Sequence, residues 1–166
     1  MTLPVAIQTI AEPLPLVLVQ RAAQLALDRV LHRHPRVFDR LGDFAGRAFC
    51  FSPVDLPFEF VVRPRARKVT AFLRRRSLRH DVRISGPLVL LLALAEGRLD
   101  GDAEFFGRQV AIDGDMEAVL ALRNALENES LDFARDLAPS NRLLRGPVEA
   151  ILGHVREVLL KREEVS

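Results

Sequence analysis

The chain has 166 residues and a mass of 18.6 kDa, which is room for one domain with terminal extensions but not for two full domains. Hydrophobic residues make up 49% of the chain and charged residues 28%, and these proportions exclude a disordered protein. The 24 basic and 22 acidic residues leave a net charge of +2, which is too small to indicate a nucleic-acid partner by itself. A single cysteine, Cys50, excludes a disulfide framework and any multi-cysteine zinc or iron–sulfur site within the chain.

The start of the chain and its apolar runs predict where the protein resides. The first 20 residues contain no Lys or Arg, so the basic start of a signal peptide is missing. The longest apolar run, Pro87 to Ala95, has nine residues, whereas a helix that spans a bilayer needs about 20. We therefore expect a cytoplasmic protein that contacts the inner membrane only at its surface, if at all.

The first half of the chain predicts one helix followed by strands. A helix from Pro15 to about Leu31 is indicated by a proline suited to the first turn and by apolar residues at helical spacing. A turn or short helix is expected near residues 37–41. Short segments rich in Phe or β-branched residues then predict four strands, at residues 47–52, 58–63, 69–74 and 81–85.

The second half of the chain returns to helical spacing. Residues 87–95 predict a helix that is apolar on all sides and must therefore be buried or face something apolar. Residues 109–113 predict a last strand, and a helix over 115–127 follows with Asp115 as its N-cap. After a loop or short helix at 128–146, residues 147–162 form the clearest amphipathic helix of the chain.

The sequence contains no recognisable catalytic constellation. None of its serines lies in a Gly-x-Ser-x-Gly motif, and its four histidines lack metal-binding spacing. His32 and His34 are expected to cap a helix end, and Asp113 and Asp115 to form a turn and a helix cap. Cys50 alternates with phenylalanines in a strand and is expected to be a buried, unreactive thiol. We therefore expect a protein that is not an enzyme and has no cofactor or metal.

Positive charge is concentrated in one window of the sequence. Residues 63–83 hold nine basic residues and one acid, a net charge of +8, while the rest of the chain holds 15 basic and 21 acidic residues, a net charge of −6. The window suits nucleic-acid phosphates, anionic lipid headgroups, or a solvated hairpin whose charge prevents sheet-to-sheet pairing. The residues expected to bind a headgroup or membrane are Arg74, Arg75, Arg76 and Arg79.

The two apolar helices allow two interpretations. They pack with the Phe-rich strands either as a closed core or as the walls of a hydrophobic tunnel for a lipid. Helical spacing alone favours the closed core, because apolar faces most often simply pack together.

Four motifs change that balance. At Ile84-Ser-Gly-Pro-Leu88, Leu99-Asp-Gly-Asp-Ala-Glu-Phe-Phe106, Val110-Ala-Ile-Asp-Gly-Asp115 and Leu120-Ala-Leu-Arg-Asn124, the sequence resembles the sterol carrier protein type two family. The resemblance covers residues 37–127 and is greatest to bacterial accessory factors of ubiquinone biosynthesis. It implies an α+β fold in which helices cover a five-stranded mixed sheet and enclose an apolar tunnel. Family members bind sterols, fatty acyl chains, phospholipids or isoprenoid lipids.

The resemblance also implies an organisation and a role. The expected parts are an N-terminal helical extension (1–36), a lipid-binding domain (37–127) and a C-terminal helical extension (128–166). The expected role is that of a carrier for an isoprenoid quinone intermediate or a phospholipid, with iron–sulfur proteins of the peptidase U32 type as partners. A nucleic-acid-binding module and a scaffold with an occluded tunnel are the alternatives. The expected tunnel residues are Phe49, Phe51, Phe58, Phe60, Phe72, Leu88, Leu91, Leu92, Phe105, Val119, Leu120 and Leu126.

Overall fold

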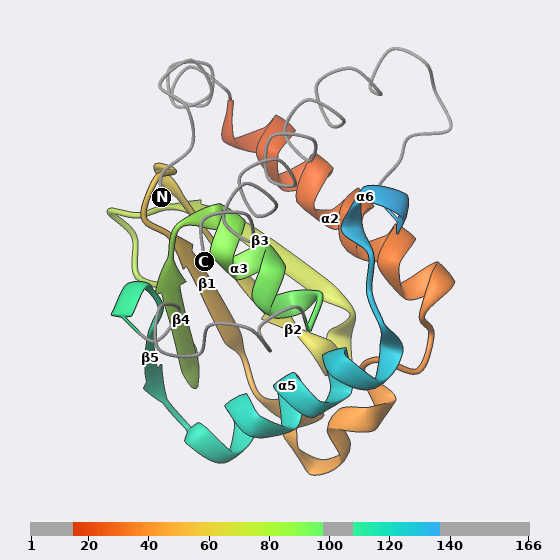
Figure 1. Cartoon of the computed structure of the whole chain (residues 1–166). Helices are drawn as coiled ribbons and strands as arrows, with labels where there is room; N and C mark the ends of the chain where they lie inside the picture. The colour runs from red at the N-terminus through yellow and green to blue at the C-terminus, as the bar shows by residue number, and fades with distance from the viewer. Residues whose placement is uncertain (1–14, 98–107, 137–166) are drawn as a thin grey trace, which may run out of the picture. The chain divides into compact units, whose positions relative to one another are not determined.

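The computed structural model describes residues 15–97 and 108–136 (Figure 1). The chain divides into two compact units, Met1–Leu131 and Asp132–Ser166. All five described strands lie in the first unit, together with three of the described α-helices.

A five-stranded mixed sheet forms the centre of the first unit. Its strand order is β3-β2-β1-β4-β5, with β1 and β4 parallel and every other neighbouring pair antiparallel. The strands differ from the predicted segments by one or two residues at their ends, and the α+β class is confirmed. Their bounds are β1 Phe49–Pro53, β2 Phe58–Arg63, β3 Lys68–Leu73, β4 Val82–Gly86 and β5 Ala111–Gly114.

The connection from β3 to β4 crosses one face of this sheet. Because β4 pairs in parallel with β1, the chain leaving β3 must pass over β2 and β1 and return to the other end of the sheet. Residues 74–81, the crossover loop, make this passage. Leu78 of the loop packs on a small cluster of Cys50, Val61 and Phe72, which therefore marks the face that the loop covers.

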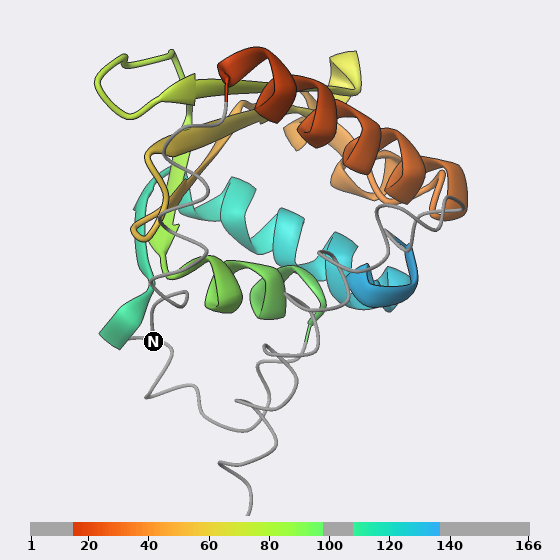
Figure 2. The same ribbon diagram turned by 90° about the horizontal axis from the view of Figure 1, so that it is seen from above.

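Helices cover the opposite face of the sheet, as Figure 2 shows for α3 and α5. Side chains from the strands and helices meet there in the main core, which includes Leu31, Leu41, Phe49, Val82, Ile84, Leu91, Ala118, Leu122 and Ala125. The elements on this face are α2 Leu16–Arg33, the 3-10 helix η1 Asp39–Gly46, α3 Leu88–Ala95 and α5 Met116–Glu129.

The ends of α2 and α5 are tied together by polar side chains. His34 is the C-cap of α2, as predicted, and its backbone N–H donates to Val30 O at 2.8 Å. The Glu129 carboxylate at the end of α5 accepts from Arg40 Nε at 2.7 Å and lies 3.6 Å from His34 Nδ1. The C-terminal ends of α2 and α5 are therefore fixed at one corner of the described part of this unit.

The second unit contributes one described helix, α6, at Phe133–Asp136. Its start is capped by the Asp132 carboxylate, which accepts from the backbone N–H of Arg135 at 3.1 Å. The amphipathic helix predicted at 147–162 lies outside the described residues.

Two glutamines of α2 bind the edge strand β3. Gln20 Oε1 accepts from the backbone N–H of Ala71 at 2.6 Å, and Gln20 Nε2 donates to Val69 O at 2.8 Å. One turn later, Gln24 Oε1 accepts from the N–H of Val69 at 3.0 Å, and its Nε2 donates to Arg67 O at 3.2 Å. The amides thus act as a substitute strand, and the edge of β3 is closed to pairing with another chain.

Removing both glutamine amides is expected to destabilise the fold. The variant Gln20→Ala/Gln24→Ala loses three hydrogen bonds to the backbone of β3 and one to Arg67 just before it, which we expect to lower the free energy of unfolding by about 2–3 kcal/mol. Arg21→Ala, an exposed substitution on the same helix, is the control and should change it by less than about 0.5 kcal/mol. Urea denaturation followed by circular dichroism measures both, and equal stability of the two variants would contradict this role.

Candidate functional site

A pocket of about 360 Å³ lies between the helix-covered face of the sheet and the helices α3 and α5. Its volume is near the lower end of the roughly 300–1,000 Å³ typical of small-molecule sites. Among the described residues that line it, Arg123 alone carries a charge. The lining consists of Phe51, Ile84, Leu91, Leu94, Ala95, Val110, Ile112, Met116, Val119, Leu120, Leu122, Arg123 and Leu126.

The floor of the pocket is a row of three side chains across neighbouring strands. Phe51 of β1 pairs with Ile84 of β4, and Ile84 pairs with Ile112 of β5. Because directly paired residues point to the same face of a sheet, the three side chains lie side by side.

The walls of the pocket come from two helices of different character. The four residues of α5 at helical spacing, Met116, Val119, Arg123 and Leu126, present one stripe of the helix to the pocket. In α3 the apolar sequence is continuous, so that Leu91 and Leu94 line the pocket while other residues of the same helix are buried elsewhere. More than one side of this helix therefore contacts apolar surroundings, as its continuous apolar sequence requires.

One side of the pocket is open to solvent. Ile112 is 39% exposed, Met116 59% and Leu120 57%, although all three are large apolar residues that line it. We call these three residues the rim. Exposed apolar side chains that gather at a concave site are typical of a place where an apolar ligand enters.

Five of the residues predicted to form a tunnel line this pocket: Phe51, Leu91, Val119, Leu120 and Leu126. Five other predicted residues and Phe72 do not line it. Phe49 belongs to the main core, Phe58 and Phe60 lie farther along the same sheet face on β2, and Leu88 and Leu92 are half-buried on α3. Phe105 lies outside the described residues.

The prediction that Phe72 lies on the same face of the sheet as Phe58 and Phe60 is wrong. Phe72 pairs with Glu59 of β2, whereas Phe58 and Phe60 occupy the alternate positions of that strand. Its side chain therefore points to the opposite face, where it packs with Cys50 and Val61. A strand's alternation fixes which residues share a face but not which face is covered by helices.

Several lining residues escaped the sequence analysis. Val110 and Ile112 alternate in the last predicted strand, and Met116 and Leu122 lie on the apolar side of the helix that follows. Their spacing was visible in the sequence. What was missing is the pairing of β5 with β4, which brings this strand to the edge of the pocket.

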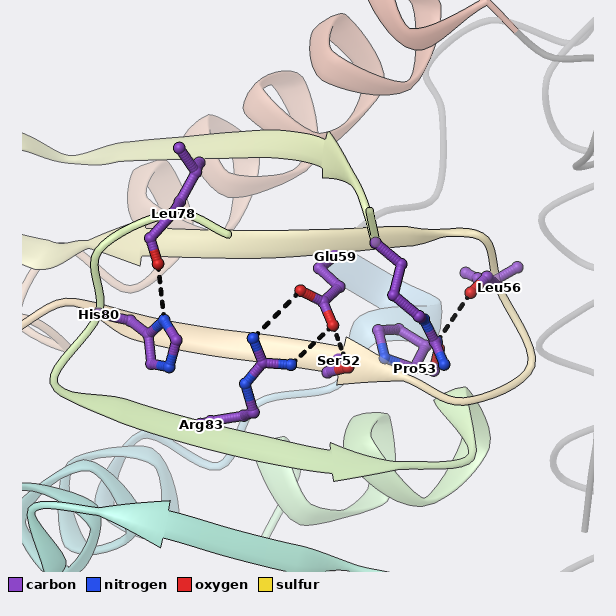
Figure 3. A network of polar contacts seen from close by, with 8 residues as sticks. Ser52, Pro53, Leu56, Glu59, Leu78, His80 and Arg83 are labelled. Carbon is purple, nitrogen blue, oxygen red and sulfur yellow. Dashed lines mark hydrogen bonds and ion pairs between the residues drawn. The ribbon is translucent and has the colours of Figure 1, made fainter. Parts of the chain in front are cut away.

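The opposite face of the sheet carries a buried ion pair (Figure 3). The Glu59 carboxylate accepts from Arg83 Nη1 at 2.8 Å and from Ser52 Oγ at 2.6 Å, and Arg83 Nη2 lies 3.4 Å from its second oxygen. Arg83 of the basic window thus already has an acidic partner within the protein.

Cys50 is buried next to this pair. Burial raises the pKa of its thiol to about 11, the nearby Arg83 guanidinium lowers it and the Glu59 carboxylate raises it. At neutral pH the thiol is therefore protonated and is a poor nucleophile, as the sequence predicted.

Residues 15–97 and 108–136 contain no group of three His, Cys, Asp or Glu side chains arranged to hold a metal ion. Within the same ranges, no helix combines the length and hydrophobicity needed to cross a bilayer.

The turn from β5 into α5 sets the position of the pocket wall. Gly114 has a φ of +104°, and a Cβ there would lie 2.2 Å from the carbonyl oxygen of Asp81. Asp115 then caps α5 by accepting from the N–H of Ala118 at 3.1 Å, as predicted. Only glycine allows the end of β5 to approach the start of β4 this closely.

Gly114→Ala is expected to lower the free energy of unfolding by about 2–4 kcal/mol, because it adds a backbone clash to an unfavourable φ. Gly42→Ala is the matched control, since Gly42 also has a positive φ of +54° but an added Cβ would meet nothing within 4 Å. That variant carries the backbone penalty without the clash and should lose about 1–3 kcal/mol, less than Gly114→Ala. Chemical denaturation measures both, and equal losses would show that the close approach at Gly114 is unimportant.

Comparisons with known proteins agree with this geometry. A family model described as the SCP-2 sterol transfer family matches residues 27–127. A solved structure described as "UbiJ-SCP2 Ubiquinone synthesis protein" superposes with a TM-score of 0.55 at 15% identity, over 72% of this chain and 98% of that one. No curated protein sequence gives a significant match.

Two further solved structures are more distant. The sterol carrier protein domain 2 of Helicoverpa armigera gives a TM-score of 0.45 at 14% identity, covering 64% of this chain and 83% of that one. The apo form of sterol carrier protein 2 from Yarrowia lipolytica gives 0.43 at 11%, covering 69% and 91%.

Proposed function

The chain belongs to the SCP-2 sterol transfer family, and we propose that it is a carrier whose pocket holds the apolar chain of a lipid. The observation that carries this proposal is the pocket itself. Its floor and walls are apolar, its one charged lining residue is Arg123, and its rim is open to solvent.

The binding mechanism requires no covalent step. Each methylene group that moves from water into an apolar pocket contributes about 0.8 kcal/mol, so ten of them contribute about 8 kcal/mol before the costs of ordering the ligand. Arg123 carries a positive charge at the wall, and its Nε also donates to Glu127 at 2.7 Å. A polar or anionic headgroup near the rim would meet this guanidinium while its chain lies on the floor.

The proposed ligand is an isoprenoid quinone intermediate or a phospholipid. The sequence resemblance to UbiT, an accessory factor of oxygen-independent ubiquinone biosynthesis, supports this choice. The name of the solved structure with the TM-score of 0.55, a ubiquinone synthesis protein, supports it too. In this role the protein would present its ligand to iron–sulfur partners of the peptidase U32 type, in the cytoplasm or at the inner membrane.

We propose residues 37–127 as the lipid-binding part and the flanking segments as additions to it. The family match begins at Leu27, inside α2, so the second half of that helix belongs to the matched region. We also propose that the chain acts without catalysis, as a carrier that leaves its ligand chemically unchanged.

Lipid occupancy tests the proposal. We expect that organic extraction of the purified full chain, followed by mass spectrometry, yields a stoichiometric isoprenoid or phospholipid, and that native mass spectrometry of the intact chain shows the same added mass. Leu120→Glu places a carboxylate on the rim, which the ligand would desolvate, and should reduce occupancy about tenfold.

Leu25→Glu is the matched control for this variant. Leu25 is 49% exposed, close to the 57% of Leu120, and it also lies in an α-helix but not in the pocket lining. Its occupancy should equal that of the unchanged chain. A chain that stays free of lipid even when lipid is offered, or equal loss in both variants, would contradict the proposal.

A further inference from the structure

The fold divides the basic window of the sequence into two separate patches. The turn patch comprises Arg63, Arg65, Arg67 and Lys68, and the loop patch comprises Arg74, Arg75 and Arg76, directly after the end of β3. Arg79 lies where the crossover loop returns towards the start of β4, which is level with the start of β3. Residues 69–73 of β3 lie between the two patches, and the residue steps from Lys68 to Arg74, at about 3.3 Å each, separate the patches by about 20 Å. That distance is about two Debye lengths at roughly 0.1 M salt, so the patches act as independent charged surfaces.

The loop patch has a fixed base and free charges. Arg74 is held by its side chain, which donates to the carbonyl oxygens of Pro53 and Leu56, and by its N–H, which donates to Pro57 O at 3.0 Å. Arg75 and Arg76 follow directly and are exposed. The backbone N–H of Arg76 donates to Leu73 O at 2.8 Å, but neither side chain forms an ion pair or hydrogen bond with a described residue.

The acid nearest in sequence to the loop patch is already engaged. Asp81 accepts from the backbone N–H of Ala48 at 2.7 Å and lies 3.8 Å from the Arg47 guanidinium. Arg79 is exposed and, within the described ranges, has no acidic partner either. No acidic side chain in residues 15–97 and 108–136 therefore neutralises Arg75, Arg76 or Arg79.

Apolar side chains accompany these arginines. Leu73, at the end of β3, is exposed. Since Gln24 bonds to Arg67 and Val69 and Gln20 bonds to Val69 and Ala71, α2 runs antiparallel to β3. The start of α2, where Val17 and Leu18 are also exposed, therefore lies towards Leu73.

From these features we infer that the loop patch, with the neighbouring apolar residues, binds the surface of a lipid bilayer that contains anionic lipids. Arginines attract anionic headgroups, and apolar side chains beside them enter the headgroup boundary. Single-stranded nucleic acid instead requires aromatic side chains on which bases stack, and Phe72, the aromatic residue next to this loop, is buried beneath it.

The bound orientation has a consequence for the carrier function. The crossover loop lies on one face of the sheet and α3 and α5 lie on the other (Figure 2). A chain anchored through the loop patch keeps the rim of the pocket away from the bilayer surface, where a protein partner can reach it. The inference adds to the proposed function and does not depend on it, because the loop patch and the pocket share no residue.

Vesicle flotation tests this inference with the full chain. We expect binding to vesicles of phosphatidylcholine and phosphatidylglycerol that weakens as salt rises, and no binding to phosphatidylcholine alone. Arg75→Gln/Arg76→Gln should reduce the partition coefficient roughly fivefold for each arginine, or about 25-fold in all. Arg67→Gln/Lys68→Gln removes the same charge from the turn patch and should reduce the partition coefficient less than about threefold. At about two Debye lengths from the membrane-binding loop, the charge of the turn patch is largely screened by salt.

Three results would overturn the inference: equal losses in the two double variants, equal binding to neutral vesicles, or a gel mobility shift with generic RNA or DNA that Arg75→Gln/Arg76→Gln abolishes while no vesicle binding is seen. Lipid extraction from the same variant keeps the two proposals apart. The lipid occupancy of its pocket should match that of the unchanged chain. An empty pocket in the variant and in the unchanged chain would count against the carrier function but not against membrane binding by the loop patch.

Discussion

The parallel pairing of β1 with β4 is the constraint on which the rest of the structure depends. Three of the four strand pairings are antiparallel, but the parallel one means that β3 cannot reach β4 by a short turn. The chain must cross the sheet, and it does so on one face only. The other face is thereby left to the helices, and the pocket forms there.

This division explains how one small domain holds two kinds of surface. On the covered face, Phe51 and Ile84 are in register because of the same parallel pairing, and Ile112 extends their row to the edge strand. On the crossed face, the polar side chains of the strands are satisfied by one another, as Glu59 is by Arg83 and Ser52. Charge and apolar lining are therefore separated by the thickness of the sheet.

Local patterns in the sequence predicted the elements well and their mutual placement less well. Each strand and each described helix was found within a few residues, because alternation and helical spacing depend only on neighbours in the chain. Phe72 was assigned to the wrong face because the parity of β3 depends on its register with β2, which no local pattern encodes. The basic window was treated as one surface for the same reason, although β3 separates its two patches.

Long-range contacts were beyond prediction altogether. The bonds from Gln20 and Gln24 to β3 join residues more than 40 positions apart, and neither glutamine belongs to a motif. The sequence also could not decide whether the apolar helices form a closed core or line a space for a ligand. Leu122 belongs to the main core and also lines the pocket, and helical spacing does not distinguish these two uses.

The most direct test of the account is to locate the bound lipid chain on the protein. A lipid with a photoreactive group near the end of its acyl or isoprenoid chain is bound by the full chain, irradiated, and mapped by peptide mass spectrometry. The account predicts crosslinks to α5 around Val119–Leu126 and to β5 near Ile112. Crosslinks confined to the crossover loop, or to the face that carries Cys50 and Glu59, would contradict it.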